Sequence, residues 1–140
     1  EKNSSKMIEC LEKAVELGDV DVLNNLGNCY HEGIGVEKNY TKEFECYVKA
    51  VELGNTRALN NIGYCYREGI GVEKNYAKMI EYFEKAAEFN NPKSFYNLGD
   101  CYENGIGVEQ NYAKSIEYYE KAVKLGNEEA KIKLNDLQKK

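Results

Sequence analysis

Residues 26–40 read LGNCYHEGIGVEKNY, and this pattern returns at residues 62–76 as IGYCYREGIGVEKNY and at residues 98–112 as LGDCYENGIGVEQNY. The interval between copies is 36 residues each time, with no insertion. A fixed interval of this length is the sequence signature of a protein in which neighbouring structural repeats stack on one another. We therefore expect an array of similar units.

Each unit is predicted to contain two helices. In the first helix, apolar residues recur at helical spacing on one side and polar residues occupy the other. Gly33 is predicted to end it, because glycine adopts the left-handed conformation of a helix C-terminus at little cost. Asn39 is a good N-terminal cap for the second helix, which Gly54 is predicted to end. In the next copy Asn90 stands where Gly54 stood and is predicted to take its role.

The constant positions are expected to form the packed interior of the array. Gly27 and Ala50 recur in every full copy, and side chains this small allow neighbouring helices to approach closely. Tyr40 and its copies Tyr76 and Tyr112 begin the second helix of each unit, and we expect them to be core residues. A single helix pair cannot bury its own apolar stripes, so stacking has to supply the missing surface.

These patterns predict an all-α fold, a right-handed α/α solenoid of stacked antiparallel helix pairs with a 36-residue period. We expect one domain over residues 1–140. Its predicted parts are the second helix of a truncated unit at 1–21, full units at 22–57, 58–93 and 94–129, and a capping helix at 130–140.

Composition excludes several classes of function. The chain has 140 residues, a formal net charge of -5 and 42% apolar residues, enough to form a core. This charge does not suit nucleic acid or an anionic membrane surface, and no apolar run is long enough for a membrane-spanning helix. Five cysteines, an odd and modest number, favour a reducing compartment, so we predict a cytoplasmic location. A segment upstream of Glu1, such as a signal sequence, is left open because the chain does not begin with Met.

No residue set predicts catalysis, a cofactor or a metal. His31 is the one histidine of the chain, and no nucleophile and acid can be grouped with it from the sequence. The Gly33–Gly35 segment resembles part of a phosphate-binding loop, but it lies between two predicted helices and has no preceding strand. We therefore predict no catalytic residues, no cofactor-binding residues and no metal ligands, and no enzymatic activity.

The cysteines occupy repeated positions. Cys29, Cys65 and Cys101 share one position of the repeat, and Cys10 and Cys46 share another. Neighbours within one column would lie roughly 8–10 Å apart, too far for a disulfide or a shared metal ion. We expect all five to be small buried apolar side chains. Disulfides between Cys10 and Cys29 and between Cys46 and Cys65 remain an alternative.

The combination of Leu-Gly-x-x-Tyr, Gly-x-Gly-Val and a later Lys-Ala pair, in three copies, resembles the Sel-one-like repeat (SLR) family of tetratricopeptide-like α/α solenoids. The resemblance covers essentially the whole chain. It implies adaptor or scaffold proteins that bind other proteins, without shared chemistry. Many members carry Trp-Tyr in the second helix, where this chain has Cys46-Tyr47, Tyr82-Phe83 and Tyr118-Tyr119.

Positions that differ between copies are candidates for partner binding, because positions that hold a stack together are expected to stay constant. Such positions recur at i, i+4 and i+7 on the polar side of the first helix, which lines the concave surface in the solenoids that this chain resembles. Three constant asparagines lie beside them. The predicted partner-binding residues are Asn24, Asn25, Asn28 and His31, then Asn60, Asn61, Tyr64 and Arg67, then Tyr96, Asn97, Asp100 and Glu103.

Tyr64, Arg67 and Tyr96 are the expected anchors, because Tyr and Arg dominate interface hot spots. Two interpretations stay open for the constant asparagines. Their amides either bind the backbone of a bound peptide, as in related solenoids, or brace a neighbouring helix. A third interpretation treats the variable positions as an ordinary solvated helix surface.

The sequence therefore predicts a non-catalytic adaptor or scaffold that binds a protein or peptide, without nucleic acid and without membrane insertion. One alternative is a structural array that associates end to end, suggested by an apolar stripe of Met7, Ile8, Leu11 and Val15 that we expect to be exposed at the chain end. The protein would then be a monomer or a weak self-associating array. Another alternative, implied by secreted cysteine-rich members of the resembling family, is a hydrolase-like (β-lactamase-like) binder of small ligands. The cysteine positions of those members hold Val51 and Leu59 here.

Overall fold

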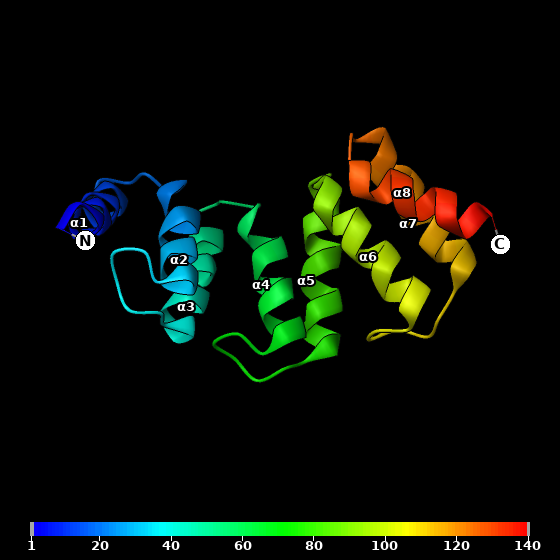
Figure 1. Ribbon diagram of the computed structural model, residues 1–140, viewed down its shortest axis with the longest axis horizontal. Helices are drawn as coiled ribbons and strands as arrows, with labels where there is room; N and C mark the ends of the chain where they lie inside the picture. Colours follow the sequence, from blue (N-terminus) through cyan, green and yellow to red (C-terminus); the bar gives the residue numbers. More distant parts are fainter. Residues whose placement is uncertain (1, 140) are drawn as a thin grey trace. The chain divides into compact units, whose positions relative to one another are not determined.

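The computed structural model describes residues 2–139, and all regular secondary structure in that range is helical (Figure 1). The chain has the predicted all-α fold of an α/α solenoid. The helices are α1 (Lys2–Glu16), α2 (Val22–Glu32), α3 (Tyr40–Glu52), α4 (Ala58–Glu68), α5 (Tyr76–Glu88), α6 (Pro92–Asn104), α7 (Tyr112–Lys124) and α8 (Glu128–Gln138). We call α2, α4, α6 and α8 the A helices, α1, α3, α5 and α7 the B helices, and the three full 36-residue copies repeats 1 to 3.

The helices belong to two compact units, which are described separately. Unit 1, Glu1–Asn75, contains α1 to α4, and unit 2, Tyr76–Lys140, contains α5 to α8. Within residues 2–139, no helix has the length and apolar character required to cross a membrane.

The predicted helix ends are confirmed. Gly33 has a φ of 74°, and its N–H donates to the carbonyl of Cys29 at the end of α2. Asn39 Oδ1 accepts a hydrogen bond from the N–H of Lys42 at 3.0 Å, which satisfies one of the free donors at the start of α3. Gly54 and Asn90 have φ values of 98° and 57°, and Asn90 is the one described residue other than glycine with a positive φ.

In unit 1, α1 packs on α2 through a small apolar cluster. Ile8 is 4% exposed and lies with Leu26 and Cys29, and the half-buried Leu11 packs against them. The expectation that the stripe on α1 would be exposed is therefore wrong for Ile8, because α2 covers it. Val15 is half-buried, and Met7 lies outside the residues whose side chains are described.

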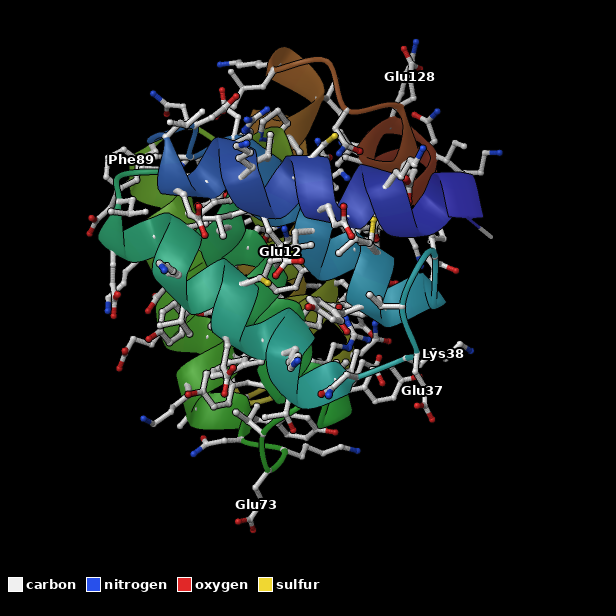
Figure 2. All side chains as sticks on the ribbon, turned by 90° about the vertical axis from the view of Figure 1, so that its left-hand side faces the viewer. Glu12, Glu37, Lys38, Glu73, Phe89 and Glu128 are labelled. Carbon is white, nitrogen blue, oxygen red and sulfur yellow. The ribbon has the colours of Figure 1, made fainter. Side chains whose placement is uncertain are left out.

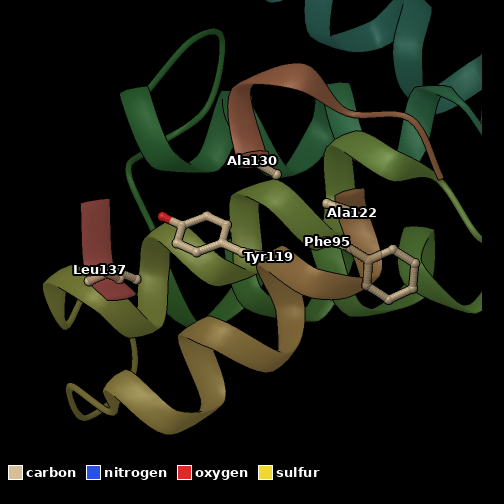
Figure 3. Packing of buried hydrophobic residues seen from close by; sticks show 5 residues of the cluster. All are labelled: Phe95, Tyr119, Ala122, Ala130 and Leu137. Atoms are coloured by element: carbon tan, nitrogen blue, oxygen red, sulfur yellow. The ribbon is translucent and has the colours of Figure 1, made fainter. Parts of the chain in front are cut away.

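In unit 2, α6, α7 and α8 share one core. Tyr119 and Ala122 of α7 are fully buried and lie with Phe95 of α6 and with Ala130 and Leu137 of α8 (Figure 3).

The prediction about small constant residues is confirmed in both units by the approach of an aromatic ring to a glycine. A Cβ at Gly99 would lie 2.6 Å from the ring of Tyr119, and a Cβ at Gly27 would lie 2.7 Å from the ring of Tyr47. Only glycine leaves room for these rings against the A helix.

The tyrosines that begin the B helices are not core residues. Tyr40, Tyr76 and Tyr112 are 46%, 41% and 53% exposed, so that prediction is wrong. At this position the backbone is packed instead of the side chain: a Cβ at Gly71, whose φ is 73°, would collide with the carbonyl group of Tyr40. The approach at Gly107 is looser, since a Cβ there would lie 3.1 Å from the carbonyl oxygen of Tyr76. The first residue of a helix directs its side chain back beyond the packed turns, which leaves the ring in solvent.

The five cysteines are free thiols. Cys29, Cys65 and Cys101 are buried, as predicted, and Cys46 is half-buried. Cys10 is exposed, so the expectation of burial is wrong there.

Candidate functional site

The twelve predicted partner-binding residues all lie on A helices, four each on α2, α4 and α6, and they differ in exposure. Asn25 and Asn28 are exposed on α2, and Tyr64 is 49% exposed on α4. Asn60 is 7% exposed and is part of the interior of unit 1. The half-buried members are Asn24, His31, Asn61 and Arg67 in unit 1, and Tyr96, Asn97, Asp100 and Glu103 in unit 2.

His31 takes part in a polar contact inside its own repeat. Its Nδ1 atom lies 2.9 Å from Oε1 of Glu43 on α3, and the Glu43 side chain is almost completely buried. The hydroxyl of Tyr47 donates to the other oxygen of Glu43 at 3.2 Å. Both oxygens of this buried carboxylate thus have a partner, which the cost of burying a charge demands.

In repeat 3 the hydroxyl of the corresponding tyrosine, Tyr119, has a different acceptor. The hydroxyl of Tyr119 donates to Oε1 of Glu103 at 2.7 Å, so the carboxylate lies on the A helix at the position that His31 occupies in repeat 1. Ser115 occupies the position of Glu43, and its hydroxyl donates to the carbonyl of Gly99 at 2.8 Å. The carboxylate that accepts from the tyrosine is thus on the A helix in repeat 3 and on the B helix in repeat 1.

Repeat 2 has neither the hydroxyl nor the acid at these positions. Phe83 and Met79 stand where the other repeats have Tyr and a polar residue, and both are fully buried. Arg67 stands in the column of His31 and Glu103, and its Nε atom lies 3.9 Å from a carboxylate oxygen of Glu68. The buried tyrosines of repeats 1 and 3 are therefore each hydrogen-bonded to one carboxylate, and repeat 2, with phenylalanine at this position, has no carboxylate at the corresponding positions.

This pairing explains part of the variation that the sequence analysis assigned to partner binding. His31 and Glu103 differ between copies because each matches the B helix that it contacts. Glu43 is not among the predicted residues, because only variation on the A helices was taken as a sign of partner binding. The sequence did contain a signal for Glu43, because the three repeat positions that hold His31, Glu43 and Tyr47 in repeat 1 change together from copy to copy.

Burial and these carboxylates alter the titration of the tyrosines. Burial, followed by the neighbouring Glu43, raises the pKa of Tyr47 far above its usual value. Burial and the hydrogen bond to Glu103 do the same to the pKa of Tyr119. Burial also raises the pKa of Tyr96. The neighbouring Lys133 partly offsets this rise, and Glu129 adds to it.

One of the constant asparagines contacts a neighbouring A helix. Asn61 Nδ2 donates to Asn24 Oδ1 at 3.5 Å, a long hydrogen bond between α4 and α2. At the start of the same helices, Asp21 accepts hydrogen bonds from Asn55 at 3.3 Å and from Arg57 at 3.0 Å. Asn61 therefore has a bracing contact in unit 1, whereas Asn25 is exposed.

Two of the thiols, Cys46 and Cys65, are poorly suited to nucleophilic chemistry. Burial raises the pKa of Cys46 to about 11 and that of Cys65 to about 12, so both stay protonated at neutral pH. In the part of the chain that the structure describes, no group of three or more His, Cys, Asp or Glu side chains could hold a metal ion.

The family follows from a comparison of the whole chain with known families. The model of the Sel1 repeat matches residues 1–19, 20–55, 56–88 and 92–127. The chain belongs to the Sel1 repeat family. Proteins of this family are generally non-catalytic scaffolds for protein interactions.

Solved structures of Sel1 repeat proteins are similar to this chain. A protective antigen of uropathogenic Escherichia coli with an SLR fold is 33% identical, with a TM-score of 0.81 over 94% of this chain and 28% of its own. A Sel1 repeat protein from Oxalobacter formigenes is 29% identical, with a TM-score of 0.86 over 93% of this chain and 52% of its own.

Helicobacter pylori cysteine rich protein B is 30% identical, with a TM-score of 0.68 over 88% of this chain and 93% of its own. The first two of these relatives are longer proteins, and this chain spans only about a quarter of the length of one and about half of the length of the other. A comparison with curated proteins found no match.

Proposed function

We propose that this Sel1 repeat chain is a non-catalytic interaction module that binds a protein or peptide on the exposed side of its A helices. The observation that carries the proposal is Tyr64, a large aromatic side chain that is 49% exposed on α4. An exposed tyrosine on a rigid helix is a typical interface anchor, because it contributes a large contact area and has few rotatable bonds.

The exposure of the predicted side chains supports some of them more than others as contacts of a partner. In unit 1, Asn25, Asn28 and Tyr64 reach solvent, and the half-buried Arg67 lies one turn after Tyr64. In unit 2, the half-buried Tyr96 lies on α6 with Asn97 and Asp100. The remaining predicted residues, Asn24, Asn60, Asn61, His31 and Glu103, are proposed to act mainly through the A-helix geometry that their burial and contacts maintain.

The proposal is tested by capture of partners from host lysate, followed by affinity measurement with each captured protein. Tyr64→Ala, and separately Tyr96→Ala, is expected to weaken binding by a factor of about ten, equivalent to about 1.4 kcal/mol. Tyr112→Ala is a matched control, because Tyr112 is 53% exposed but begins a B helix. Unchanged affinity for the Tyr64 and Tyr96 variants, or an equal loss for the control, would refute the choice of surface.

The absence of catalysis is part of the proposal and has its own test. We expect no turnover of β-lactam or ester substrates, and a rate that disappears on substitution of one residue would contradict this. Self-association is not favoured, because α2 covers Ile8, which belongs to the stripe that suggested it. A rise in sedimentation coefficient with concentration would contradict this conclusion.

A further inference from the structure

A groove in unit 1 lies apart from the exposed side of the A helices. It has a volume of about 370 Å³ and is formed by α1, α2 and α3, with Tyr30 and Cys46 in its lining. Figure 2 shows Glu12 on the side of α1 that faces these two helices. This volume is at the small end of the range for ligand sites, about 300–1,000 Å³.

Unit 2 contains the same set of positions 72 residues later, on α5, α6 and α7. Seven of the ten residues that line the groove have an identical residue type there, including Tyr30, which corresponds to Tyr102, and Lys42, which corresponds to Lys114. Unit 2 therefore shows which side chains occupy the equivalent space in a second copy of these positions.

The three differences all concern the size of the lining side chains. Val15 corresponds to Ala87, which leaves slightly more room in unit 2. Leu23 corresponds to Phe95, and Cys46 corresponds to Tyr118. The groove in unit 1 thus lies where repeat 3 places a tyrosine ring and repeat 1 has only a thiol.

In unit 2 that ring stacks with two others. Tyr118 stacks on Tyr102 with ring centroids 5.6 Å apart and an angle of 16° between the planes. Its ring also stacks with Phe95 at 6.3 Å and 28°. The ammonium groups of Lys114 and Lys121 lie 5.1 Å and 5.6 Å from the centroids of Tyr102 and Tyr118, as cation–π contacts require.

We propose that the groove of unit 1 binds an aromatic side chain of a partner polypeptide, which stacks on Tyr30 as Tyr118 stacks on Tyr102. The site is separate from the exposed side of the A helices, so it does not depend on the function proposed above.

The charges around the groove complement such an occupant. Lys42 lies 5.6 Å from the centroid of the Tyr30 ring, as Lys114 does from Tyr102 at 5.1 Å. Lys49 corresponds to Lys121, which lies 5.6 Å from the centroid of Tyr118, so Lys49 can face the electron-rich surface of an incoming ring. The carboxylates of the lining, Glu12, Glu16 and Glu45, outnumber these two lysines by one. A partner segment with a basic residue beside its aromatic residue would balance that charge.

The test is an NMR titration of the ¹⁵N-labelled chain with an acetylated and amidated GKYGG peptide. We expect saturable shifts of amide signals around Tyr30 and Cys46, and binding at least five-fold weaker for GKLGG. Tyr64→Ala should leave these shifts unchanged, since Tyr64 lies on the A-helix surface. Absence of saturable shifts at the groove in the wild-type chain, or equal affinity for the two peptides, would overturn the proposal.

Variants supply a second, independent test. Cys46→Tyr should fill the groove with the residue that repeat 3 uses and abolish binding, whereas Cys46→Ser should keep it. Tyr118→Cys should open the corresponding groove in unit 2 and add a second set of shifts there. Unchanged binding by folded Cys46→Tyr would refute the site. If that variant does not fold, the comparison of GKYGG with GKLGG on the wild-type chain still decides.

Discussion

The polar contact inside repeat 1 makes a quantitative prediction. Glu43 is 4% exposed, and its two oxygens contact His31 Nδ1 at 2.9 Å and the Tyr47 hydroxyl at 3.2 Å. Repeat 2 has Met79 and Phe83 at the corresponding positions, both fully buried. The double substitution Glu43→Met with Tyr47→Phe therefore copies the buried pair of repeat 2, and the His31 ring, whose side chain is 34% exposed, is left to hydrogen-bond with water. Each single substitution instead leaves a buried polar group without its partner.

The expected free energies follow from which polar groups lose a partner. Tyr47→Phe removes one donor from a buried carboxylate and should cost about 1.5–3 kcal/mol, and Glu43→Met leaves a buried hydroxyl without its acceptor and should cost about 1–3 kcal/mol. The double variant removes both groups together and should lie within about 1 kcal/mol of the wild type. The coupling energy, the sum of the two single losses minus the loss of the double variant, should then be about 1.5–6 kcal/mol.

Urea unfolding at pH 7, followed by far-ultraviolet circular dichroism on the wild type and the three variants, measures this coupling. The reasoning is refuted if the double variant loses as much stability as the two single variants combined. Glu43→Met with Tyr119→Phe is a matched control, because Tyr119 contacts Glu103 and shares no partner with Glu43. That pair should be additive within about 0.5 kcal/mol.

Three further predictions concern the backbone and the thiols. Gly71→Ala should lower stability by more than about 2 kcal/mol in thermal unfolding, because a left-handed backbone costs about 1–2 kcal/mol and a Cβ there also meets the carbonyl group of the preceding repeat. Gly54 has a φ of 98°, but a Cβ there would have nothing within 4 Å, so Gly54→Ala should lose only the stability that the left-handed backbone costs. Equal losses of stability in the two variants would contradict the collision at Gly71. In a thiol titration of the native chain, Cys10 should react quickly and the other thiols mainly after unfolding; fast native reaction of Cys65 would show that its burial is wrong. Finally, the stability that burial of Cys46 and Cys65 contributes should be fully present below their unfolded pKa of 9.0 and be lost above it, because their pKa values rise to about 11 and about 12 on folding. The unfolded chain then loses protons that the native chain keeps; urea midpoints that do not fall between pH 9 and pH 11 would contradict this.

Features that depend on neighbours along the chain were predictable. Asn39 caps α3 and Asn90 adopts a positive φ because these properties arise within a few residues of backbone. The 36-residue interval likewise indicates stacked helix pairs, since copies of one helical hairpin present the same faces to one another. The all-α fold and the Sel1 repeat family follow from these local and periodic signals.

Features that depend on contacts between helices were not predictable. The ring of Tyr40 is exposed although its position is constant, because its backbone, not its side chain, meets the glycine of the next repeat. His31 varies with Glu43, twelve residues away. The groove at Cys46 exists because Leu23 and Cys46 stand where unit 2 has the rings of Phe95 and Tyr118. Helical periodicity says which side of a helix is apolar, but packing across helices determines which side chains meet, which carboxylate is buried, and where a space for a partner remains.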